Sequence, residues 1–347
     1  MSIIEKVKNY FEKEGNRTLG LTRKTEISIL GKGESNLNLL ARNGGKEFVV
    51  RVSLLEKSRT RREYNILKAI ESLQIAPHPY IIDDSKKFVD EDFIIIEKLP
   101  GSQLSGYVSA DDARAIAKIL SKLHCKKYTG FGQIGESLKK GTLYDSLNER
   151  FGWACYELTS LIEEVMSNNK INNLKYSILP VLLKMKYAFN EICLKNKSDF
   201  LETHFSVVHG DFRQWNILKH SGGLSILDWE LARVADPAED IASFFNGGYI
   251  SASNKKIFMN EYLKSGADKT LEKRVQVYEL LQMMGTAYWV GKKYYRSKMN
   301  KLHRELNPVG KDKEYLKYFF QFISRFIKQS GLDPRMTSPK ARRLGRL

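Results

Sequence analysis

The chain of 347 residues is long enough to form two domains, or two lobes around a cleft. Its hydrophobic fraction of 42% favours a folded chain over a disordered one, and no apolar run reaches the roughly 18–20 residues that a membrane helix requires. The formal net charge of +17 leaves two interpretations open, an anionic partner such as ATP, RNA or a phospholipid surface, or a solvated surface rich in lysine.

The first hundred residues are predicted to form a small, strand-rich lobe. Residues 1–16 have the spacing of an amphipathic helix and not the composition of a signal peptide, so the protein is expected to be soluble and cytoplasmic. An Asn-Gly-Gly turn at 43–45 suits a hairpin, and residues 56–72 are expected to form a helix with one buried face. Five runs rich in apolar and β-branched residues are the expected strands: 27–30, 36–41, 46–53, 80–83 and 93–99.

The rest of the chain is predicted to form a larger lobe made mainly of helices. Ser109 is the expected N-cap of a helix that begins the stretch 109–201, all of which has helical character. Two short strands, FSVVHGD at 205–211 and LSILDW at 224–229, precede further helices up to about residue 330. The expected organisation is an α+β, bilobal fold with a basic, disordered tail, divided into residues 1–99, 100–330 and 331–347.

The chemistry is expected at the loop HGDFRQWN, residues 209–216. A carboxylate and an amide five positions apart suit phosphoryl transfer, because Asp211 can accept the proton of an attacking hydroxyl and Asn216 can ligate a metal on the nucleotide. Twelve residues after the amide, Asp228 ends the next strand, and a hairpin would return it to the loop. There its carboxylate can hold Mg²⁺, a cation that takes carboxylate and phosphate oxygens.

These segments resemble those of a known family. HGDFRQWN resembles the H-G-D-x-x-x-x-N signature of the aminoglycoside phosphotransferase, choline kinase and homoserine kinase-like family. LDWE at 227–230 resembles that family's form of the kinase D-F-G segment, and ADPAEDIASFF at 235–245 is similar to the D-P-x-x-D-L-A segment that follows it. The resemblance extends from about residue 25 to residue 325 and implies a protein-kinase-like fold, with an antiparallel-sheet lobe and a larger helical lobe.

The resemblance also implies roles for single residues. It implies that Asp211 is the catalytic base and that Asn216 and Asp228 bind Mg²⁺. His209 and Asp240 would hold the catalytic loop in shape. Arg213 falls two residues after the base, where protein kinases often carry a lysine near the γ-phosphate.

The small lobe is expected to bind ATP through a glycine-bearing loop. GKGESN at 31–36 resembles the family's G-x-S-N loop between the first two strands. Glycines there would let the backbone approach the phosphates closely, and two polar side chains would add contacts. The residues expected to bind the nucleotide in this loop are Gly31, Gly33, Ser35 and Asn36.

Two further parts of the small lobe are expected to contact ATP. Arg51 replaces the lysine of the protein-kinase V-A-I-K strand and keeps a positive charge for the phosphates, with Glu63 on the next helix as its partner. FIIIEKLPG at 93–101 resembles the hinge between lobes, where backbone near Glu97 and Leu99 would bond the adenine. The apolar contacts expected for the adenine are Leu30, Val50 and Ile96.

Together these features predict an ATP- and Mg²⁺-dependent phosphotransferase that moves the γ-phosphate to a hydroxyl of a small molecule: choline, ethanolamine, a sugar, an amino-alcohol or an aminoglycoside. Membrane insertion is not expected. Two alternatives stay open, the same chemistry on an RNA acceptor and a non-catalytic nucleotide-binding sensor. A protein kinase is disfavoured because no A-P-E segment follows Asp228.

The expected acceptor wall disfavours a polycationic aminoglycoside. The stretch 141–200 contains seven acidic and seven basic residues, so it lacks the acidic excess that several buried ammonium groups would need. Two local features keep a cationic acceptor open: a possible acidic cluster and a possible aromatic box for a single quaternary ammonium. Their residues are Glu157, Glu163 and Glu164 for the cluster, and Phe151, Trp153 and Tyr156 for the box.

Overall fold

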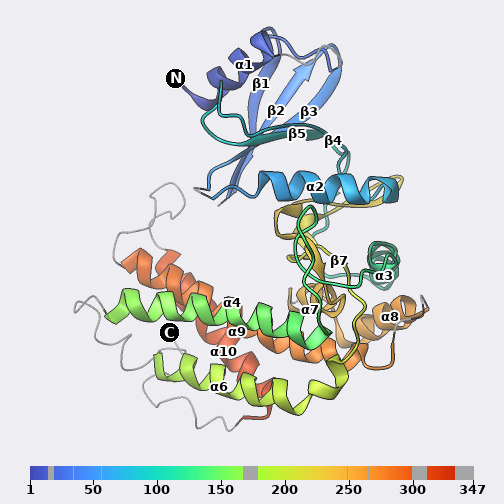
Figure 1. The fold of residues 1–347 in the computed structure, drawn as a ribbon, viewed down its shortest axis with the longest axis vertical. Helices are drawn as coiled ribbons and strands as arrows, with labels where there is room; N and C mark the ends of the chain where they lie inside the picture. The colour runs from blue at the N-terminus through green and yellow to red at the C-terminus, as the bar shows by residue number, and fades with distance from the viewer. Residues whose placement is uncertain are drawn as a thin grey trace.

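The structure, a computed structural model, describes residues 1–14, 19–33, 35–55, 57–166, 179–247, 249–264, 266, 268–298 and 311–332. It has two lobes, a small one built on a sheet at the top of Figure 1 and a larger helical one below it. The bilobal α+β organisation predicted from the sequence is confirmed. Most of the tail that was expected to be disordered, residues 333–347, lies outside the described residues.

The small lobe contains a five-stranded antiparallel sheet. Its strands are β1 (Glu26–Lys32), β2 (Asn36–Asn43), β3 (Lys46–Ser53), β4 (Pro79–Asp83) and β5 (Phe93–Glu97). They lie in the order β1-β2-β3-β5-β4. The predicted hairpin turn joins β2 to β3 through Gly44 and Gly45, whose φ angles of 55° and 79° lie in the left-handed region that favours glycine.

The two faces of this sheet have different partners. Helix α1 (Ile3–Lys13) covers one face, where Val50 of β3 is completely buried in the same apolar cluster as residues of that helix. Helix α2 (Thr60–Ile70) lies against the other face, where Val49 joins the core that continues into the larger lobe. Because side chains alternate along a strand, Arg51 points to this second face, toward α2 and the larger lobe.

The larger lobe is built from seven helices in the described part of the chain: α3 (Ala110–His124), α4 (Leu143–Met166), α6 (Leu179–Lys195), α7 (Ala238–Asn246), α8 (Ala252–Leu263), α9 (Leu271–Lys298) and α10 (Lys311–Ser330). The long helices α4, α6, α9 and α10 lie side by side at the bottom of Figure 1, and α9 packs closely against both α7 and α10. None of the described helices is long and apolar enough to cross a membrane.

Short strands flank the loops that lie between the lobes. They are β6 (Ser102–Gln103), β7 (Ser206–Val208), β8 (Ile217–His220), β9 (Gly223–Ile226) and β10 (Arg233–Ala235), with the one-turn helices η1 (Glu71–Leu73), η2 (Lys197–Phe200), η3 (Gln214–Asn216) and η4 (Trp229–Leu231). β8 and β9 form a hairpin, and β7 pairs with β10. The hairpin returns the chain to the end of β7, as the sequence predicted for Asp228.

The stretch 109–201 is not helical throughout. Between the end of α3 and the start of α4 the chain forms an irregular loop, in which Phe131 makes an isolated bridge with Lys139. Gly132 and Gly135 have φ angles of 130° and 94°, values that stop a helix and favour glycine. These glycines were the local signal for the loop. Residues 167–178 lie outside the described residues.

Candidate active site

The loop predicted to carry the chemistry connects β7 to β8, and its carboxylate lines a cleft between the lobes. His209 at its start is completely buried. The His209 Nε2 donates a hydrogen bond to the carbonyl of Leu227 at 2.8 Å, which leaves Nδ1 to accept the N–H of Asp211 at 3.3 Å. Since Leu227 directly precedes Asp228, His209 ties the two predicted functional segments to each other.

A second anchor of the loop is Asp240, a buried carboxylate in the first turn of α7. It accepts the N–H of His209 at 2.7 Å and that of Gly210 at 2.9 Å. His124 of α3 bonds the same carboxylate through Nε2 at 3.3 Å, and its Nδ1 lies 2.7 Å from the Tyr262 hydroxyl. Burial acts to raise the pKa of Asp240, but the hydrogen bond from His124 and the interactions with His209 lower it below its usual value. The carboxylate is therefore ionised and holds the loop backbone.

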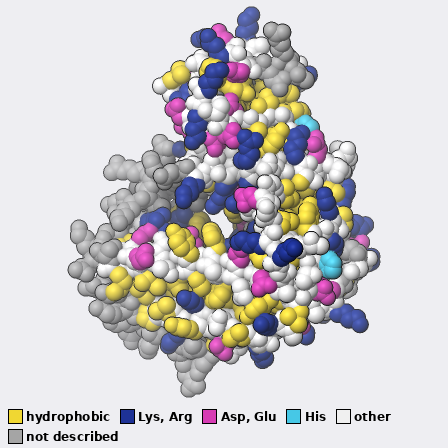
Figure 2. Space-filling view, in the orientation of Figure 1, with side chains coloured by type: hydrophobic (Ala, Val, Ile, Leu, Met, Phe, Trp, Pro, Cys, Tyr) yellow, Lys and Arg dark blue, Asp and Glu magenta, His cyan; other side chains and the backbone are white. Residues whose placement is uncertain are grey.

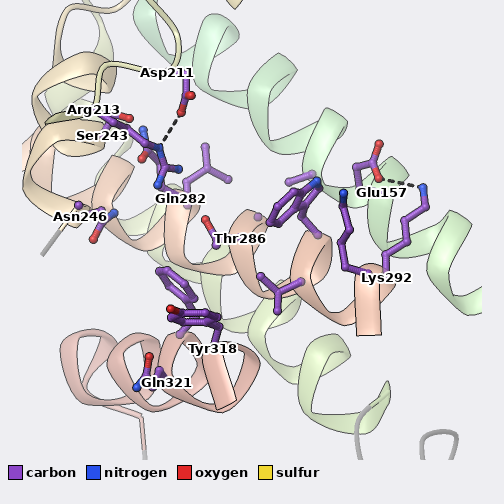
Figure 3. A pocket seen from close by; sticks show the side chains of 18 of the residues that line it. Glu157, Asp211, Arg213, Ser243, Asn246, Gln282, Thr286, Lys292, Tyr318 and Gln321 are labelled. Carbon is purple, nitrogen blue, oxygen red and sulfur yellow. Dashed lines mark hydrogen bonds and ion pairs between the residues drawn. The ribbon is translucent and has the colours of Figure 1, made fainter. Parts of the chain in front are cut away.

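Asp211 faces the cleft with a third of its side chain exposed. Its Oδ1 accepts a hydrogen bond from the Arg213 Nε at 2.6 Å, an ion pair marked in Figure 3. Asn216 donates through Nδ2 to the Asp211 carbonyl at 2.9 Å and lies 3.5 Å from its Oδ2. One carboxylate oxygen thus lies against a fixed cation, while the other is left for a group in the cleft.

Asp228 ends the β8–β9 hairpin in a left-handed conformation, with φ 67° and ψ 62°. A non-glycine residue adopts this region only when its surroundings hold it there. The holding contact is an ion pair with Arg51, whose Nε also donates to Glu63 at 2.9 Å. Glu230 lies 3.7 Å from the same guanidinium. The expected partner of Arg51 is therefore present, and the arginine joins the small lobe to the segment of the larger lobe that carries Asp228.

Arg51 and Glu63 are buried, and the charges around them shift both of their pKa values. Burial acts to lower the pKa of Arg51, but the charges of Glu63, Asp228 and Glu230 outweigh it and raise that pKa. Burial raises the pKa of Glu63 to about 7, although the charge of Arg51 acts in the opposite direction. The guanidinium is therefore a permanent cation at the point where the two lobes meet.

The oxygen donors at the end of the hairpin fit Mg²⁺. Asn216 uses its Nδ2 for the loop backbone, which leaves its amide oxygen for a metal. One carboxylate oxygen of Asp228 accepts a hydrogen bond from Arg51, and the other oxygen is available to a metal. The side chain of Asp228 is 41% exposed. Mg²⁺ is commonly held by one or two carboxylate or amide oxygens together with phosphate oxygens. No group of three or more His, Cys, Asp or Glu side chains among the described residues forms an all-protein metal site.

The glycine-bearing loop lies at the edge of the same cleft. Neither Gly31 nor Gly33 needs a left-handed backbone, and a Cβ atom at Gly31 would meet nothing within 4 Å, so the space beside the loop is open. Ser35 lines the cleft. Asn36 points inward and donates to Glu230 at 2.6 Å, so in this structure its amide orders the base of the loop. Glu34 lies outside the described residues.

The hinge segment leaves the sheet at the end of β5. Glu97 exchanges hydrogen bonds with His78: its N–H donates to the His78 carbonyl at 2.9 Å, and its carboxylate accepts the His78 N–H at 3.1 Å. Leu99 follows as a partly buried residue, and Leu30 of β1 is about half exposed. The expectation that Val50 contacts the adenine is wrong, because Val50 is buried in the apolar cluster between the sheet and α1. The side chain of Val49 lies on the other face of the sheet, toward the larger lobe.

The cleft beyond Asp211 is large and lined by helices of the larger lobe. It has a volume of about 1590 Å³ and extends from Ser35 and Asp211 to side chains of α4, α9 and α10. Figure 3 shows Asp211 and Arg213 at one side, Thr286 of α9 in the centre, and Tyr318 of α10 on the wall below them. A space of this size beside Asp211 is large enough for a small molecule together with phosphate groups.

Two of the three acids in the cluster that the sequence allowed are paired with cations, and the third, Glu163, is exposed and does not line the cleft. Glu157 pairs with Lys292 at 3.1 Å, and Glu164 pairs with Arg296. The aromatic box is absent as well. Phe151 packs against Phe189, Tyr156 is 68% exposed outside the cleft, and only Trp153 lines it, with the Arg150 guanidinium over its ring.

Several functional candidates were missed in the sequence. His124 ends the apolar face of α3, and a histidine at a buried helical position was its only signal. Tyr262 and Glu230 gave no local signal, because their partners are 138 and 194 residues away in sequence. Trp289 of α9, 44% exposed in the cleft, and Arg325 of α10 lie in helices that were predicted without assigned roles.

One family model matches most of the chain. Residues 26–255, well over half of the chain, match the family model described as the phosphotransferase enzyme family, APH. Among curated proteins, acyl-CoA dehydrogenase family member 11 of Pongo abelii is 23% identical over 229 residues. The matched region is 61% of this chain and 26% of that protein, so the chain spans about a quarter of the length of the curated relative that it matches.

Solved structures share the fold at low identity. An ethanolamine kinase of Plasmodium vivax is 18% identical, with a TM-score of 0.65 over 97% of this chain and 89% of that one. The choline kinase LicA of Streptococcus pneumoniae is 17% identical, with a TM-score of 0.61 over 95% and 99%. The aminoglycoside phosphotransferase APH(4)-Ia, solved as a ternary complex with AMP-PNP and hygromycin B, is 13% identical, with a TM-score of 0.58 over 94% and 98%. The predicted kinase-like fold is confirmed.

Proposed function

The chain belongs to the APH phosphotransferase enzyme family, and from this premise we propose that it transfers the γ-phosphate of ATP to a hydroxyl group of a small molecule. The observation that carries the proposal is that Asp211 and Asn216 share one loop, which Asp240 anchors, and that His209 ties this loop to Leu227, the residue before Asp228. A base, an amide and a second carboxylate in this arrangement suit phosphoryl transfer. The solved relatives named as choline and ethanolamine kinases support a small hydroxylated acceptor.

Each group has a distinct task in this proposal. The free oxygen of Asp211 accepts the proton of the acceptor hydroxyl, while Arg213 holds the other oxygen in place. Asn216 and Asp228 hold Mg²⁺, which when bound neutralises charge on the phosphates. Arg51 places a permanent cation beside the expected phosphate site, and the loop of Gly31, Gly33, Ser35 and Asn36 covers it.

The nucleotide is proposed to lie between the sheet and the β8–β9 hairpin. The AMP-PNP complex of the related aminoglycoside phosphotransferase supports a nucleotide site in this fold. Glu97 and Leu99 mark the hinge beside which the adenine would bind. The division into residues 1–99 for the nucleotide and 100–330 for catalysis and the acceptor stays part of the proposal. A non-catalytic sensor is disfavoured, because a sensor has no need for a base and two metal ligands in one place.

A metal titration tests this proposal. Asp228→Ala should abolish Mg²⁺-supported formation of a phosphorylated product, measured by mass spectrometry with ATP and a pool of hydroxylated metabolites. Asp111→Ala removes a carboxylate whose side chain is 95% exposed on α3 and serves as the control, which should behave as the wild type. An Asp228→Ala protein with unchanged dependence on Mg²⁺ would remove that residue from the site. A wild-type protein that forms no product would contradict the proposed activity.

A further inference from the structure

The acceptor part of the cleft is strongly basic. Eight Lys and Arg side chains and three Asp and Glu side chains line the described cleft. Helices α4, α9 and α10 contribute six of these cations but only one lining carboxylate, Glu157. Of these six cations, Lys292 pairs with Glu157, and Arg150 and Arg296 pair with Glu239 and Glu164 behind the lining. Figure 2 shows lysine and arginine side chains gathered around the hollow between the lobes. This part of the cleft is away from the glycine-bearing loop, so ATP alone does not account for its charge.

Arg325 on α10 is a partly buried cation without an acidic partner among the residues that the structure describes. Its guanidinium donates to the carbonyl of Asn246 at 3.3 Å and to its amide oxygen at 3.2 Å, both neutral acceptors at the end of α7. Burial lowers the pKa of Arg325, and the charge of Glu279 only partly opposes this. A buried charge without a counter-ion is costly, and an anion in the cleft would offset that cost.

A second positive centre lies at the other end of α7. Arg150 and Arg233 share one carboxylate, that of Glu239: the Arg150 Nε donates to one oxygen at 3.0 Å, and Arg233 binds the other. Two cations against one anion leave a net positive charge, and Arg150 lines the cleft. Glu239 and Asn246 are seven residues apart, so the two centres are separated by about 10 Å along the helix axis. That distance can be spanned by one metabolite.

The groups that would bind a cationic acceptor are already occupied by protein cations. The Arg150 guanidinium carbon lies 4.8 Å from the centroid of the Trp153 ring, and the Lys293 Nζ lies 4.9 Å from that of Trp289. Glu157 is neutralised by Lys292, at the opposite side of the pocket from Asn246 in Figure 3. Among the residues that the structure describes, an ammonium group entering this part of the cleft would meet positive side chains and no lining carboxylate besides Glu157, Asp211 and Glu230, each of which has a cationic partner.

We propose that the acceptor is a hydroxylated molecule bearing a phosphate or carboxylate group. Arg325 binds this anionic group, and the hydroxyl group of the acceptor lies at Asp211. This inference rests on the proposed phosphotransferase function and narrows its acceptor class. It selects anionic acceptors over the choline, ethanolamine and aminoglycoside classes, whose members are cations.

Binding of inorganic phosphate tests the anion site independently of turnover. The nucleotide site is first filled with AMP-PNP and Mg²⁺, and phosphate is then titrated while the fluorescence of the cleft tryptophans or the heat of binding is followed. The wild type should bind phosphate, and Arg325→Gln should weaken this binding about ten- to hundredfold, the range expected for loss of a charge-assisted hydrogen bond. Arg325→Lys should recover part of it, which separates a charge effect from damage to the fold.

Lys328→Gln, an exposed lysine on the same helix that does not line the cleft, is the matched control and should bind phosphate as the wild type does. Absent binding in the wild type, or equal binding in Arg325→Gln, would overturn the assignment. If AMP-PNP still binds while phosphate does not, the anion site is wrong and the proposed phosphotransferase function is not contradicted.

A product screen then identifies the anion. The protein is offered ATP, Mg²⁺ and an equimolar pool of glucosamine, choline, glucose, gluconate, glucose 6-phosphate and glycerol 3-phosphate. The anionic members should be phosphorylated fastest, and the ratio of gluconate to sugar phosphate products distinguishes carboxylate from phosphate recognition. Preferred turnover of choline, glucosamine or glucose would contradict the inference while leaving the phosphotransferase activity intact.

Discussion

Arg51 is one of the residues through which the two lobes contact each other at the candidate site. It comes from a strand of the small lobe, pairs with Glu63 on the following helix, and reaches Asp228 in the larger lobe. Its side chain is only 10% exposed, so these interactions operate in a medium where charges are weakly screened. Under the proposed function, nucleotide phosphates would compete with Asp228 for the Arg51 guanidinium, and Mg²⁺ would compete with Arg51 for the Asp228 carboxylate.

Arg51→Ala should raise the KM for ATP about ten- to hundredfold, because a charge-assisted contact to the phosphates is lost. It should also lower the free energy of unfolding by about 3–5 kcal/mol, since buried carboxylates lose their counter-ion. Arg51→Lys should recover part of the ATP affinity, because the charge stays but the planar fork does not. Steady-state kinetics and urea unfolding give both quantities.

Arg42→Ala on the neighbouring strand is the control for Arg51→Ala, because Arg42 forms an exposed pair with Glu47 and should change neither quantity. A wild-type KM and kcat in Arg51→Ala would show that this arginine does not serve the nucleotide.

Single residues were predictable where the chemistry is local in sequence. Asp211 and Asn216 share one loop, so their spacing predicted that they would lie close together. Arg51 and Glu63 lie on consecutive elements, and the similarity of this strand to the protein-kinase pattern predicted their pairing. The prediction for Val50 was wrong because alternate side chains of a strand point to opposite faces of the sheet, and the sequence alone does not say which face α1 covers. The role of Asn36 in binding Glu230 depends on a contact between the lobes, which no local pattern encodes.

At the scale of elements, helix α7 supports the whole site. Its first turn carries Asp240, which binds the backbone of the catalytic loop, and Glu239, which binds two arginines. Its last residue, Asn246, binds Arg325. Every residue of this helix is buried, so its position is fixed by packing and its polar groups are oriented without freedom.

Asp240→Asn should make stability less dependent on pH. The pKa of Asp240 is lower in the folded protein than the unfolded value of about 3.9, so its ionised form contributes stability above that value and the contribution is lost as the pH falls through the folded pKa. At pH 7 the variant should be less stable by roughly 3–5 kcal/mol. The difference should shrink as the pH falls below about 4, as urea unfolding between pH 7 and pH 3 would measure.

Asp84→Asn, which changes an exposed carboxylate paired with Arg61, should stay close to the wild type throughout this range. A difference between Asp240→Asn and the wild type that does not vary with pH would mean that Asp240 is not held in its ionised form.

Element types were predictable from periodicity, but the contacts between distant elements were not. The β8–β9 hairpin followed from two apolar runs close in sequence, and it brought Asp228 to the loop as expected. The bonds from His124 and Arg150 to α7 join residues 116 and 89 positions apart. Such pairs arise from the packing of the larger lobe, and a histidine or arginine within a helical pattern does not name its partner.

At the scale of the whole molecule, the structure shows where part of the net charge of +17 lies. The sequence allowed either an anionic partner or a solvated basic surface. The described cleft places an excess of cations on the side of α4, α9 and α10, next to Asp211, so part of the charge faces a space where a ligand can bind. Field lines that converge in such a cleft attract anions, and this attraction weakens with added salt.

The central claim is that Asp211 is the base of a phosphoryl transfer in this cleft. The most direct measurement compares kcat for Asp211→Asn and the wild type, using ATP, Mg²⁺ and the best acceptor of the product screen, with AMP-PNP binding measured alongside. The account predicts a fall in kcat of about 10²–10⁴-fold with nucleotide affinity retained, because the loss falls on the transition state. Asp90→Asn, an exposed aspartate of the small lobe, should keep wild-type rates. An Asp211→Asn protein that retains more than about a tenth of wild-type kcat would contradict the account.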